Sequence, residues 1–417
     1  MNNYFDEIVK EISRSVAIDS SYSQPKVGMP FGEGAAKALE SFLSLASSLG
    51  FRTKNYDNYI GEVIFGEGED FAVLAHLDVV PAGNGWKHSP FGGEVDEVNK
   101  RIWGRGTMDD TGPAIITLYA LKALKDEGFT PGKRIKLIVG CNEESGWGCI
   151  EHYNKVAKMP ETGISPDADF PVIYAEKGIM QIKLRLPAND KFTSLKGGEA
   201  ANMVCAYCEV TAPADAQKMT EYGLKQKGGK LYFTGKSAHG STPDKGINAI
   251  APVLRYLGMD REAQALFEDK LGLKHLQDET GPLTLSPNVI TQEDDGIFVT
   301  CDVRYPATLK RGVIVEILDK CGYEYEILHE QAPLFNDRNG YLISTLLGVY
   351  NEVMGANAQP VAIGGGTYAR ALKNGAAFGP EEDGDEPTIH QPDEYITFEK
   401  IRKCFAIYKL AIERLTR

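Results

Sequence analysis

The chain has 417 residues, of which 42% are hydrophobic and 25% are charged. This length and composition indicate a globular protein that divides into two domains. The formal net charge of −13 argues against a nucleic-acid-binding surface, because such a surface needs clustered Lys and Arg side chains.

The ends and cysteines of the chain bear on its compartment. Residues 1–7 contain acids and lack the apolar core of a signal peptide, and no stretch approaches the length of a membrane span. The seven cysteines are an odd number without the spacing of a disulfide framework. We therefore expect reduced thiols and a cytoplasmic protein that has neither a membrane nor a nucleic acid as a partner.

Two short apolar runs in the first half of the chain each lead into polar residues. Residues 71–75 and 135–140 predict strands that are buried on both faces. Residues 113–128 lie between them and have helical spacing, with Pro in the first turn and Gly past the end. This order predicts an open α/β sheet that binds ligands at its carboxyl edge. Amphipathic helices at 342–354 and 398–415 continue the same architecture.

The middle of the chain has a different pattern. Residues 180–186, 297–303 and 323–327 alternate apolar and polar side chains, which predicts antiparallel strands with one solvated face. Helical segments lie between them at 248–259 and 309–321. The predicted fold class is therefore α/β, with a mixed, largely parallel sheet in a discontinuous domain and an inserted α+β domain. The expected boundaries are 1–178, 179–332 and 333–417.

Six segments carry nearly all the side chains that could act as catalytic groups or metal ligands. Taken singly, each has a structural explanation, because a lone histidine is usually a satisfied polar residue and an acid pair is usually solvated. Adjacent carboxylates at the end of a buried strand, however, repel one another and lose hydration, so a cation should neutralise them. Imidazole and carboxylate together suit zinc, cobalt or manganese. The segments are residues 76–78, 104–110, 142–145, 165–169, 234–240 and 389–394.

In this order the six segments resemble the aminoacylase, carboxypeptidase G, ArgE and DapE family of metallopeptidases, which use two co-catalytic metal ions. The chain is most similar to the PepV-like dipeptidases, which act on Xaa-His and β-Ala-Xaa dipeptides. Residues 28–34, 165–171 and 390–396 carry this closer likeness, which covers essentially the whole chain. The resemblance implies that the discontinuous domain is catalytic, with a dizinc-peptidase-type fold, and that the insert is a ferredoxin-like lid.

The resemblance also implies a ligand set for two divalent metal ions per subunit. Asp109 would bridge the two ions, His76 and Asp167 would complete one site, and Glu144 and His390 would complete the other. Zinc is the expected metal, and manganese or cobalt would accept the same nitrogen and oxygen ligands.

The family pattern assigns roles to residues beside these ligands. Glu143 would be the general base that takes a proton from the attacking water, and Asp78 would orient His76. The bond between Asp109 and Asp110 resembles a non-proline cis peptide of the family.

One ligand has a competitor, and three aromatic residues near the motifs need an explanation. Asp169 competes with Asp167, which is favoured because the family's ligand is the first acid after the proline. We expect Trp86, Trp103 and Trp147 to pack in the core.

The insert would supply residues that contact the substrate. His239 would donate a hydrogen bond to the developing oxyanion, and Asn202 matches a position near the substrate. Arg304 matches an arginine that holds the substrate's carboxylate, although an outward-facing strand arginine is the structural alternative. A further loop would line the specificity side of the site and contains Gly365, Gly366 and Thr367.

We therefore predict a dipeptidase that hydrolyses the amide bond of a small peptide. The alternative with the same catalytic residues is an N-acyl amino acid amidohydrolase, such as a deacetylase or desuccinylase. A non-catalytic binding relative is disfavoured, because every ligand and the base are present. Monomer and homodimer both remain open, and with them whether His239 acts in its own subunit. Side-chain specificity is also open.

Overall fold

The computed structural model describes residues 4–293 and 296–417 and divides them into two compact units. The first unit comprises the described residues up to Tyr174 together with Asn336–Val361 and Thr367–Arg417, and the second comprises Ala175–Phe335 and Ala362–Gly366.

The two units do not divide the chain exactly as the sequence predicts. The boundaries expected after residues 178 and 332 fall after residues 174 and 335. Ala362–Gly366, expected in the catalytic domain, belongs to the second unit. Two hydrogen bonds connect this segment to the rest of the second unit: the N–H of Lys177 donates to the carbonyl of Ile363 at 3.0 Å, and Arg304 Nη1 donates to the carbonyl of Gly364 at 3.1 Å.

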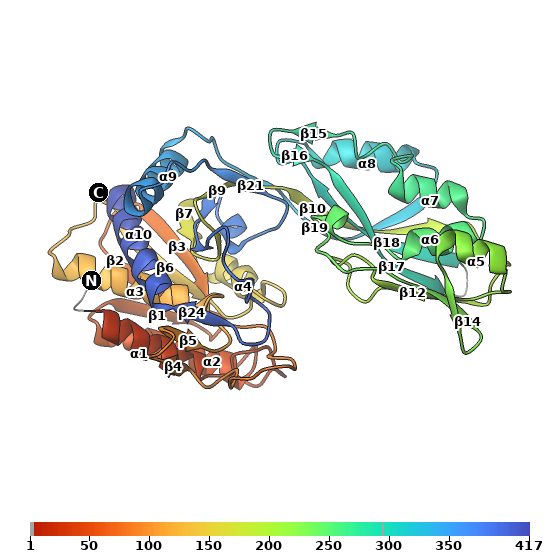
Figure 1. Ribbon diagram of the computed structural model, residues 1–417. Coiled ribbons are helices and arrows are strands. Elements are labelled where there is room, and N and C mark those ends of the chain that lie inside the picture. Colours follow the sequence, from red (N-terminus) through yellow and green to blue (C-terminus); the bar gives the residue numbers. More distant parts are fainter. Residues whose placement is uncertain (1–3, 294–295) are drawn as a thin grey trace. The chain divides into compact units, whose positions relative to one another are not determined.

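A nine-stranded mixed sheet has most of its strands in the first unit (Figure 1). Strands β6, β3, β7 and β22 are parallel, whereas β1, β2, β9 and β20 pair antiparallel on either side. In sheet order the strands are β1 (Arg52–Tyr56), β2 (Ile60–Phe65), β6 (Arg134–Gly140), β3 (Asp70–His76), β7 (Thr162–Ser165), β22 (Asn374–Ala377), β9 (Ile173–Glu176) and β20 (Leu334–Phe335), with β21 (Val361–Ile363) also paired to β9.

Helices and two small sheets complete the first unit. Helix α3 packs against β3, α1 and α10, so its residues are buried almost all round, and α2 packs against β1 and β2. The helices are α1 (Phe5–Val16), α2 (Glu33–Ser48), α3 (Thr111–Asp126), α4 (Gly148–Val156), α9 (Tyr341–Met354), α10 (Phe398–Thr416) and the 3₁₀ helix η2 (Tyr368–Ala371). The small sheets are β24 (Tyr395–Thr397), β5 (Arg101–Trp103) and β4 (Glu94–Asp96), and β23 (Pro380–Glu381) with β8 (Ala168–Asp169).

An eight-stranded sheet forms the second unit, and all its pairings are antiparallel. Its strands in order are β13 (Lys225–Lys227), β14 (Lys230–Thr234), β12 (Tyr207–Thr211), β11 (Ser194–Gly197), β17 (Thr284–Glu293), β18 (Gly296–Tyr305), β10 (Gly178–Leu186) and β19 (Glu324–Gln331). Its further elements are α5 (Ala216–Tyr222), α6 (Ile250–Tyr256), α7 (Asp260–Phe267), α8 (Arg311–Lys320), η1 (Pro243–Lys245), β15 (Gln277–Asp278) and β16 (Gly281–Pro282).

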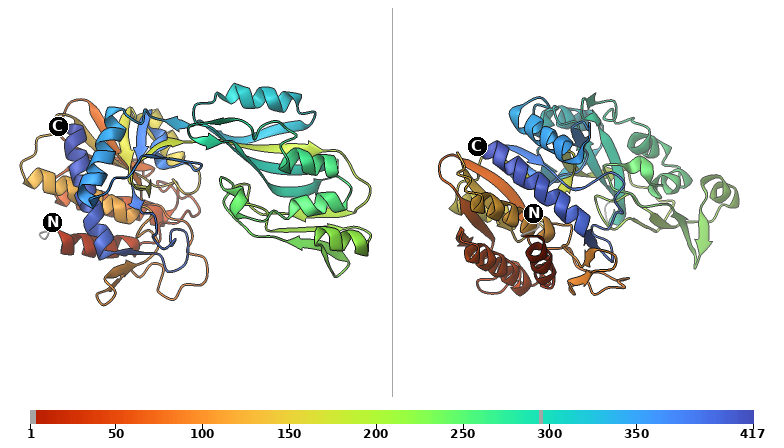
Figure 2. Two further views of the ribbon diagram at one scale, coloured as in Figure 1. Left: turned by 45° about the horizontal axis from the view of Figure 1, so that its top comes forward. Right: turned by 60° about the vertical axis from the view of Figure 1, so that its left-hand side comes forward.

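The helices of the second unit lie along one face of this sheet (Figures 1 and 2). The alternating pattern of β10 follows from this arrangement. Met180, Ile182, Leu184 and Leu186 are buried in the core on the helix side, while the residues between them are half-buried. The period of two predicted for this strand is therefore confirmed.

The close spacing of β3 and β7 yields a stability prediction. A Cβ at Gly163 would lie 2.3 Å from the carbonyl oxygen of Ala72, which is backbone and does not move easily. We expect Gly163→Ala to destabilise the protein by about 1–3 kcal/mol.

Gly348 in α9 is the matched control, because a Cβ there meets nothing within 4 Å. Alanine at this helical position should stabilise by about 0.5–1 kcal/mol. Urea unfolding of the two variants measures both effects. Equal midpoints would contradict the strand spacing described here.

Candidate active site

The parallel strands of the first unit bring the predicted ligands to one edge of the sheet. His76 is the last residue of β3, Glu143 and Glu144 follow the end of β6, and Asp167 lies two residues beyond β7. Parallel neighbours end at the same edge, so residues far apart in the sequence converge there.

Asp109 lies between two imidazoles at this edge. One of its oxygens, Oδ1, is 3.0 Å from Nε2 of His76, and the other, Oδ2, is 2.8 Å from Nε2 of His390. The Nε2 atom of His390 is also 3.0 Å from Oε1 of Glu144, and that of His76 is 3.7 Å from Oδ1 of Asp167. A carboxylate that presents one oxygen to each of two histidines has the arrangement expected of a bridging ligand.

Two groups among the described residues could each hold a metal ion, with ligand atoms within 4.8 Å of one another. One is His76, Asp109 and Glu144, and the other is His76, Glu143 and Asp167. Nitrogen and carboxylate oxygen donors at this spacing suit a divalent transition metal. The donor set therefore fits the cations that the sequence predicts.

The histidines of the site are stabilised in their protonated forms. Burial alone would lower the pKa of His76, but hydrogen bonds to Asp109 and Asp167 raise that pKa well above its ordinary value. Hydrogen bonds to Asp109 and Glu144 raise the pKa of His390 to about 10. Protons on these rings therefore occupy the place where a bound cation would neutralise the carboxylates.

The carboxyl groups of the site outnumber its two histidines, and burial together with their mutual repulsion opposes the ionisation of several of them. Burial and the charge of Asp167 raise the pKa of Glu143 well above its ordinary value. Burial and the charge of Asp109 raise the pKa of Glu144 to about 7. Burial also acts to raise the pKa of Asp109, but the two histidines lower it overall. Concentrated buried acid of this kind is typical of a cation site.

The backbone and the side chain of Asp78 make different contacts in the site. The Nδ1 atom of His76 lies 2.9 Å from the main-chain carbonyl oxygen of Asp78, whereas the nearest carboxylate oxygen is 3.7 Å away. The carboxylate instead accepts the N–H groups of Glu143 at 2.9 Å and Glu144 at 3.1 Å. Asp78 thus orients His76 through its backbone and holds the acid pair through its side chain.

Trp147 was expected in the core, but it contacts the site. Its indole Nε1–H donates to Oε1 of Glu143 at 3.1 Å, and its ring meets the ring of Tyr368 edge-on at 5.4 Å between centroids. Asn142 stabilises the turn between β6 and α4, because its Oδ1 accepts the N–H of Gly148 at 2.9 Å. In the sequence, this contact is indicated only by the position of the tryptophan four residues after the predicted base.

Tyr368 is a site residue that the sequence analysis missed. Its side chain is fully buried and lies edge-on to His76, with 6.1 Å between ring centroids. Its hydroxyl lies 3.2 Å from Sγ of Cys149, and its backbone hydrogen-bonds to Asp167. Thr367, expected to line the specificity loop, accepts the N–H of Ala369 at the start of η2.

Asp110 and Asp169 are close in sequence to the predicted ligands Asp109 and Asp167, and the structure shows what each contacts. The Asp109–Asp110 peptide is cis, as the resemblance implied, and Oδ2 of Asp110 accepts the N–H of His76 at 3.1 Å. Asp167 belongs to one of the candidate ligand groups, whereas Asp169 lies on β8 and belongs to neither.

The substrate-binding residues predicted in the insert gather around Asp302 in the second unit. Arg304 is buried and donates to both oxygens of Asp302, from Nε at 2.9 Å and from Nη2 at 2.8 Å. It is therefore not an outward-facing strand residue. Gly240, which follows His239, packs on Asp302 so closely that an added Cβ would lie 2.4 Å from its oxygen.

Hydrogen bonds join the remaining predicted residues to this group. The carbonyl of Asn202 accepts the N–H of Gly240 at 2.7 Å, and Nδ1 of His239 lies 2.7 Å from Oγ of Ser241. The glycine loop is adjacent, because a Cβ on Gly364 would lie 2.7 Å from that of Ser241. Gly365 and Gly366 belong to the same segment of the second unit.

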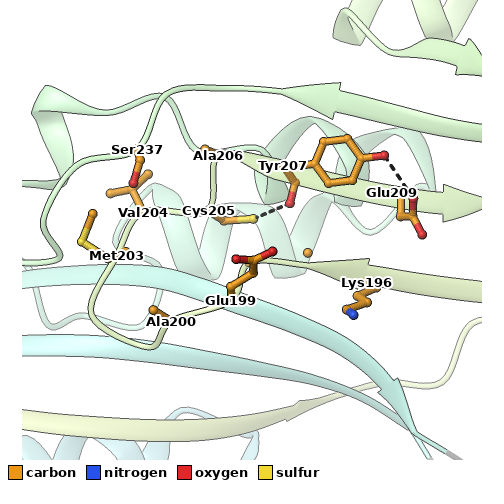
Figure 3. Close-up of a pocket in the computed structure, with 12 residues that line it drawn as sticks. Lys196, Glu199, Ala200, Met203, Val204, Cys205, Ala206, Tyr207, Glu209 and Ser237 are labelled. Atoms are coloured by element: carbon orange, nitrogen blue, oxygen red, sulfur yellow. Dashed lines mark hydrogen bonds between the residues drawn. The ribbon is translucent and has the colours of Figure 1, made fainter. Parts of the chain in front are cut away.

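A cavity of about 550 Å³ lies in the second unit and is lined by residues between 196 and 209 together with Ser237 (Figure 3). Its lining includes Lys196, Glu199, Met203 and Tyr207, and the hydroxyl of Tyr207 donates to Glu209 at 3.1 Å. None of the predicted metal ligands is among its lining residues.

No helix in the described part of the chain is long and apolar enough to cross a membrane. All seven cysteines are free, and six of them are buried.

Comparison with known proteins gives one consistent family. Residues 72–414 match "Peptidase family M20/M25/M40". "Putative dipeptidase YtjP" of Bacillus subtilis is 35% identical, in an alignment that covers 99% of this chain and 98% of that protein. "Putative dipeptidase SAUSA300_1697" of Staphylococcus aureus is 34% identical and covers 100% of this chain and 98% of its own length.

Solved structures share the fold at low sequence identity. Human carnosine dipeptidase 1 superposes with a TM-score of 0.62 at 14% identity, over 99% of this chain and 97% of its own. Aminopeptidase PepT of Bacillus cereus also gives 0.62, at 16% identity over 99% of both chains. The family match over most of the chain, together with full-length relatives above 30% identity, leads to one conclusion: the chain belongs to peptidase family M20/M25/M40.

Proposed function

We propose that the protein is a metal-dependent dipeptidase that hydrolyses the amide bond of small peptides. The observation that carries the proposal is the buried cluster at the sheet edge, where Asp109 faces both His76 and His390 with Glu143 beside them. The full-length likeness to relatives named as dipeptidases supports the choice of substrate.

Two divalent metal ions are proposed for this cluster, with zinc as the first choice and manganese or cobalt as alternatives. The proposed ligands are His76, Asp109, Glu144, Asp167 and His390. When bound, such ions would polarise the scissile carbonyl and lower the pKa of the attacking water.

Glu143 is the proposed general base. Its carboxylate would take a proton from the attacking water and then pass that proton to the leaving amine. The neighbouring residues hold it for this task, because Asp78 binds its backbone N–H and Trp147 donates to one carboxylate oxygen. The second carboxylate oxygen remains available for proton transfer.

The group around Asp302 is proposed to bind the substrate. Arg304 has five N–H groups, and its hydrogen bonds to Asp302 and Gly364 use three of them. The two others could hold the carboxylate of a dipeptide, which a guanidinium binds well. His239 is proposed to donate to the developing oxyanion, and Asn202 and the loop that contains Gly365, Gly366 and Thr367 to contact the substrate.

We also propose that the enzyme acts in the cytosol as a monomer or homodimer. Seven unpaired cysteines support a reducing compartment.

The pKa values of the histidines predict how metal affinity depends on pH. In the metal-free site His76 and His390 hold protons at neutral pH, because both pKa values are raised. A metal ion binds only the neutral imidazole, so binding must release these protons. We expect the affinity for Zn²⁺ or Mn²⁺ to rise about tenfold per pH unit for each proton released, between about pH 6 and 8.

Competition titration with a chromophoric chelator measures this slope, and calorimetry in two buffers of different ionisation enthalpy counts the protons. His390→Ala should reduce the slope by about one proton. An affinity that does not change with pH would contradict the protonated state described here.

Hydrolysis of a substrate panel tests the activity itself. The panel contains free dipeptides, β-alanyl dipeptides, tripeptides, and N-acetyl and N-succinyl amino acids, each assayed after chelation and after return of Zn²⁺, Mn²⁺ or Co²⁺. We expect metal-dependent cleavage of the dipeptides. Cleavage confined to the N-acyl compounds would identify an amidohydrolase instead, and no turnover with metal bound would favour a binding role.

Glu143→Gln tests the base in the same assay. It should lower kcat by about 10²–10⁴-fold without loss of metal binding, because the amide cannot accept the proton. Glu151→Gln is the matched control, since this exposed glutamate in α4 should leave kcat unchanged. A Glu143→Gln enzyme with normal kcat would remove Glu143 from the mechanism.

A further inference from the structure

A buried ion pair joins the loop that carries Asp109 to the segment that follows His390. The carboxylate of Glu394 and the guanidinium of Arg105 are 0% and 2% exposed, and Oε2 of Glu394 is 2.6 Å from Nη1 of Arg105. Cζ of Arg105 lies over the ring of Trp86, 5.2 Å from its centroid. Removing two charges from water costs free energy, which their mutual attraction and hydrogen bonds offset. Nε of Arg105 is buried and has no hydrogen-bond partner among the described residues, so the pair relies on its contact through Nη1 and on the bonds made by Glu394.

The other oxygen of Glu394 binds the backbone of the same loop. Oε1 accepts the N–H of Gly106 at 3.0 Å and that of Met108 at 2.9 Å, and the N–H of Asp109 lies 3.4 Å away. The main-chain carbonyl of Glu394 accepts the N–H of Gly104 at 2.9 Å. Because residues 104–110 form neither helix nor strand, this one residue supplies acceptors that a regular element would otherwise provide.

Glu394 also connects the two chain segments that carry Asp109 and His390. It lies four residues after His390, and Nε2 of His390 is 2.8 Å from Oδ2 of Asp109. The segment that carries His390 and the loop that carries Asp109 are therefore joined twice, once at the ligand atoms and once at the buried pair. The contact at the ligand atoms needs a proton at Nε2 of His390 or a metal ion, whereas the contacts of Glu394 need neither.

We propose that Glu394 is a positioning residue, which holds the Asp109 loop against the His390 segment and so sets the geometry in which Asp109 meets two ligand partners. The inference rests on the proposed function in so far as Asp109 and His390 bind metal. Glu394 itself contacts neither the substrate nor the reacting atoms.

Glu394→Gln is the decisive variant, because it keeps the shape and the Oε1 acceptor but removes the charge. We expect the affinity for Co²⁺ to fall about 10–100-fold, as it does when outer partners of metal ligands are changed. The visible absorption of bound Co²⁺ should also shift, since it reports ligand geometry without any substrate. At saturating Co²⁺, kcat should fall more than KM changes.

Two further variants separate positioning from folding. Arg105→Gln with Glu394→Gln leaves no unpaired buried charge, so the thermal midpoint should recover while the Co²⁺ affinity stays low. Glu386→Gln removes an exposed carboxylate that binds the hydroxyl of Tyr395 nearby, and it should leave the Co²⁺ affinity and spectrum unchanged.

The outcomes distinguish this inference from the proposed function. A Glu394→Gln protein with a lower thermal midpoint but native Co²⁺ affinity and spectrum would reduce Glu394 to a structural brace and overturn the inference alone. A wild-type protein that binds Co²⁺ but cleaves no panel substrate would overturn the dipeptidase proposal, while the Co²⁺ measurements would still decide the role of Glu394. Failure of the wild type to bind Co²⁺ would overturn both.

Discussion

The structure of the first unit depends on a concentration of negative charge that is buried at the carboxyl edge of its sheet. Asp109 presents one oxygen to His76 and the other to His390, and Glu143, Glu144 and Asp167 lie around them. Carboxylates this close and this buried repel one another unless a cation or protons intervene. The raised pKa values of both histidines and of Glu143 are the response of the metal-free site to that repulsion.

Two further carboxylates hold the loops that carry these groups by accepting backbone N–H groups. The carboxylate of Asp78 binds the N–H groups of Glu143 and Glu144, and that of Glu394 binds the N–H groups of Gly106 and Met108. Both carboxylates are buried, so these charge-assisted hydrogen bonds act in a medium of low dielectric constant. The irregular loops at the sheet edge are thereby given defined positions, which a metal site requires.

The second unit repeats this principle with a single ion pair. Asp302 and Arg304 are adjacent on the same side of β18, both buried, and the loops that carry His239 and Gly364 pack on them. The antiparallel sheet provides a rigid support for residues whose proposed task is to bind substrate. The candidate residues of the second unit therefore lie around the buried carboxylate of Asp302.

The amino-acid sequence alone was sufficient to predict the strands that end at His76 and before Glu143, because apolar runs and helical spacing are local properties. The sequence also predicted which histidines and acids are the ligands, because the family resemblance depends only on the order of the motifs along the chain. The structure was needed for contacts between residues far apart in the chain. Tyr368 reaches His76, and Glu394 reaches the loop of Asp109, through the packing of separate strands.

Other features depended on backbone geometry. The backbone carbonyl of Asp78 contacts His76 while its carboxylate binds Glu143, and Trp147 also contacts Glu143. These contacts follow from how the chain turns after β3 and β6. Ala362–Gly366 joins the second unit through two hydrogen bonds that no local pattern encodes. Hydrophobic periodicity determines which elements form, whereas long-range hydrogen bonds determine what those elements place side by side.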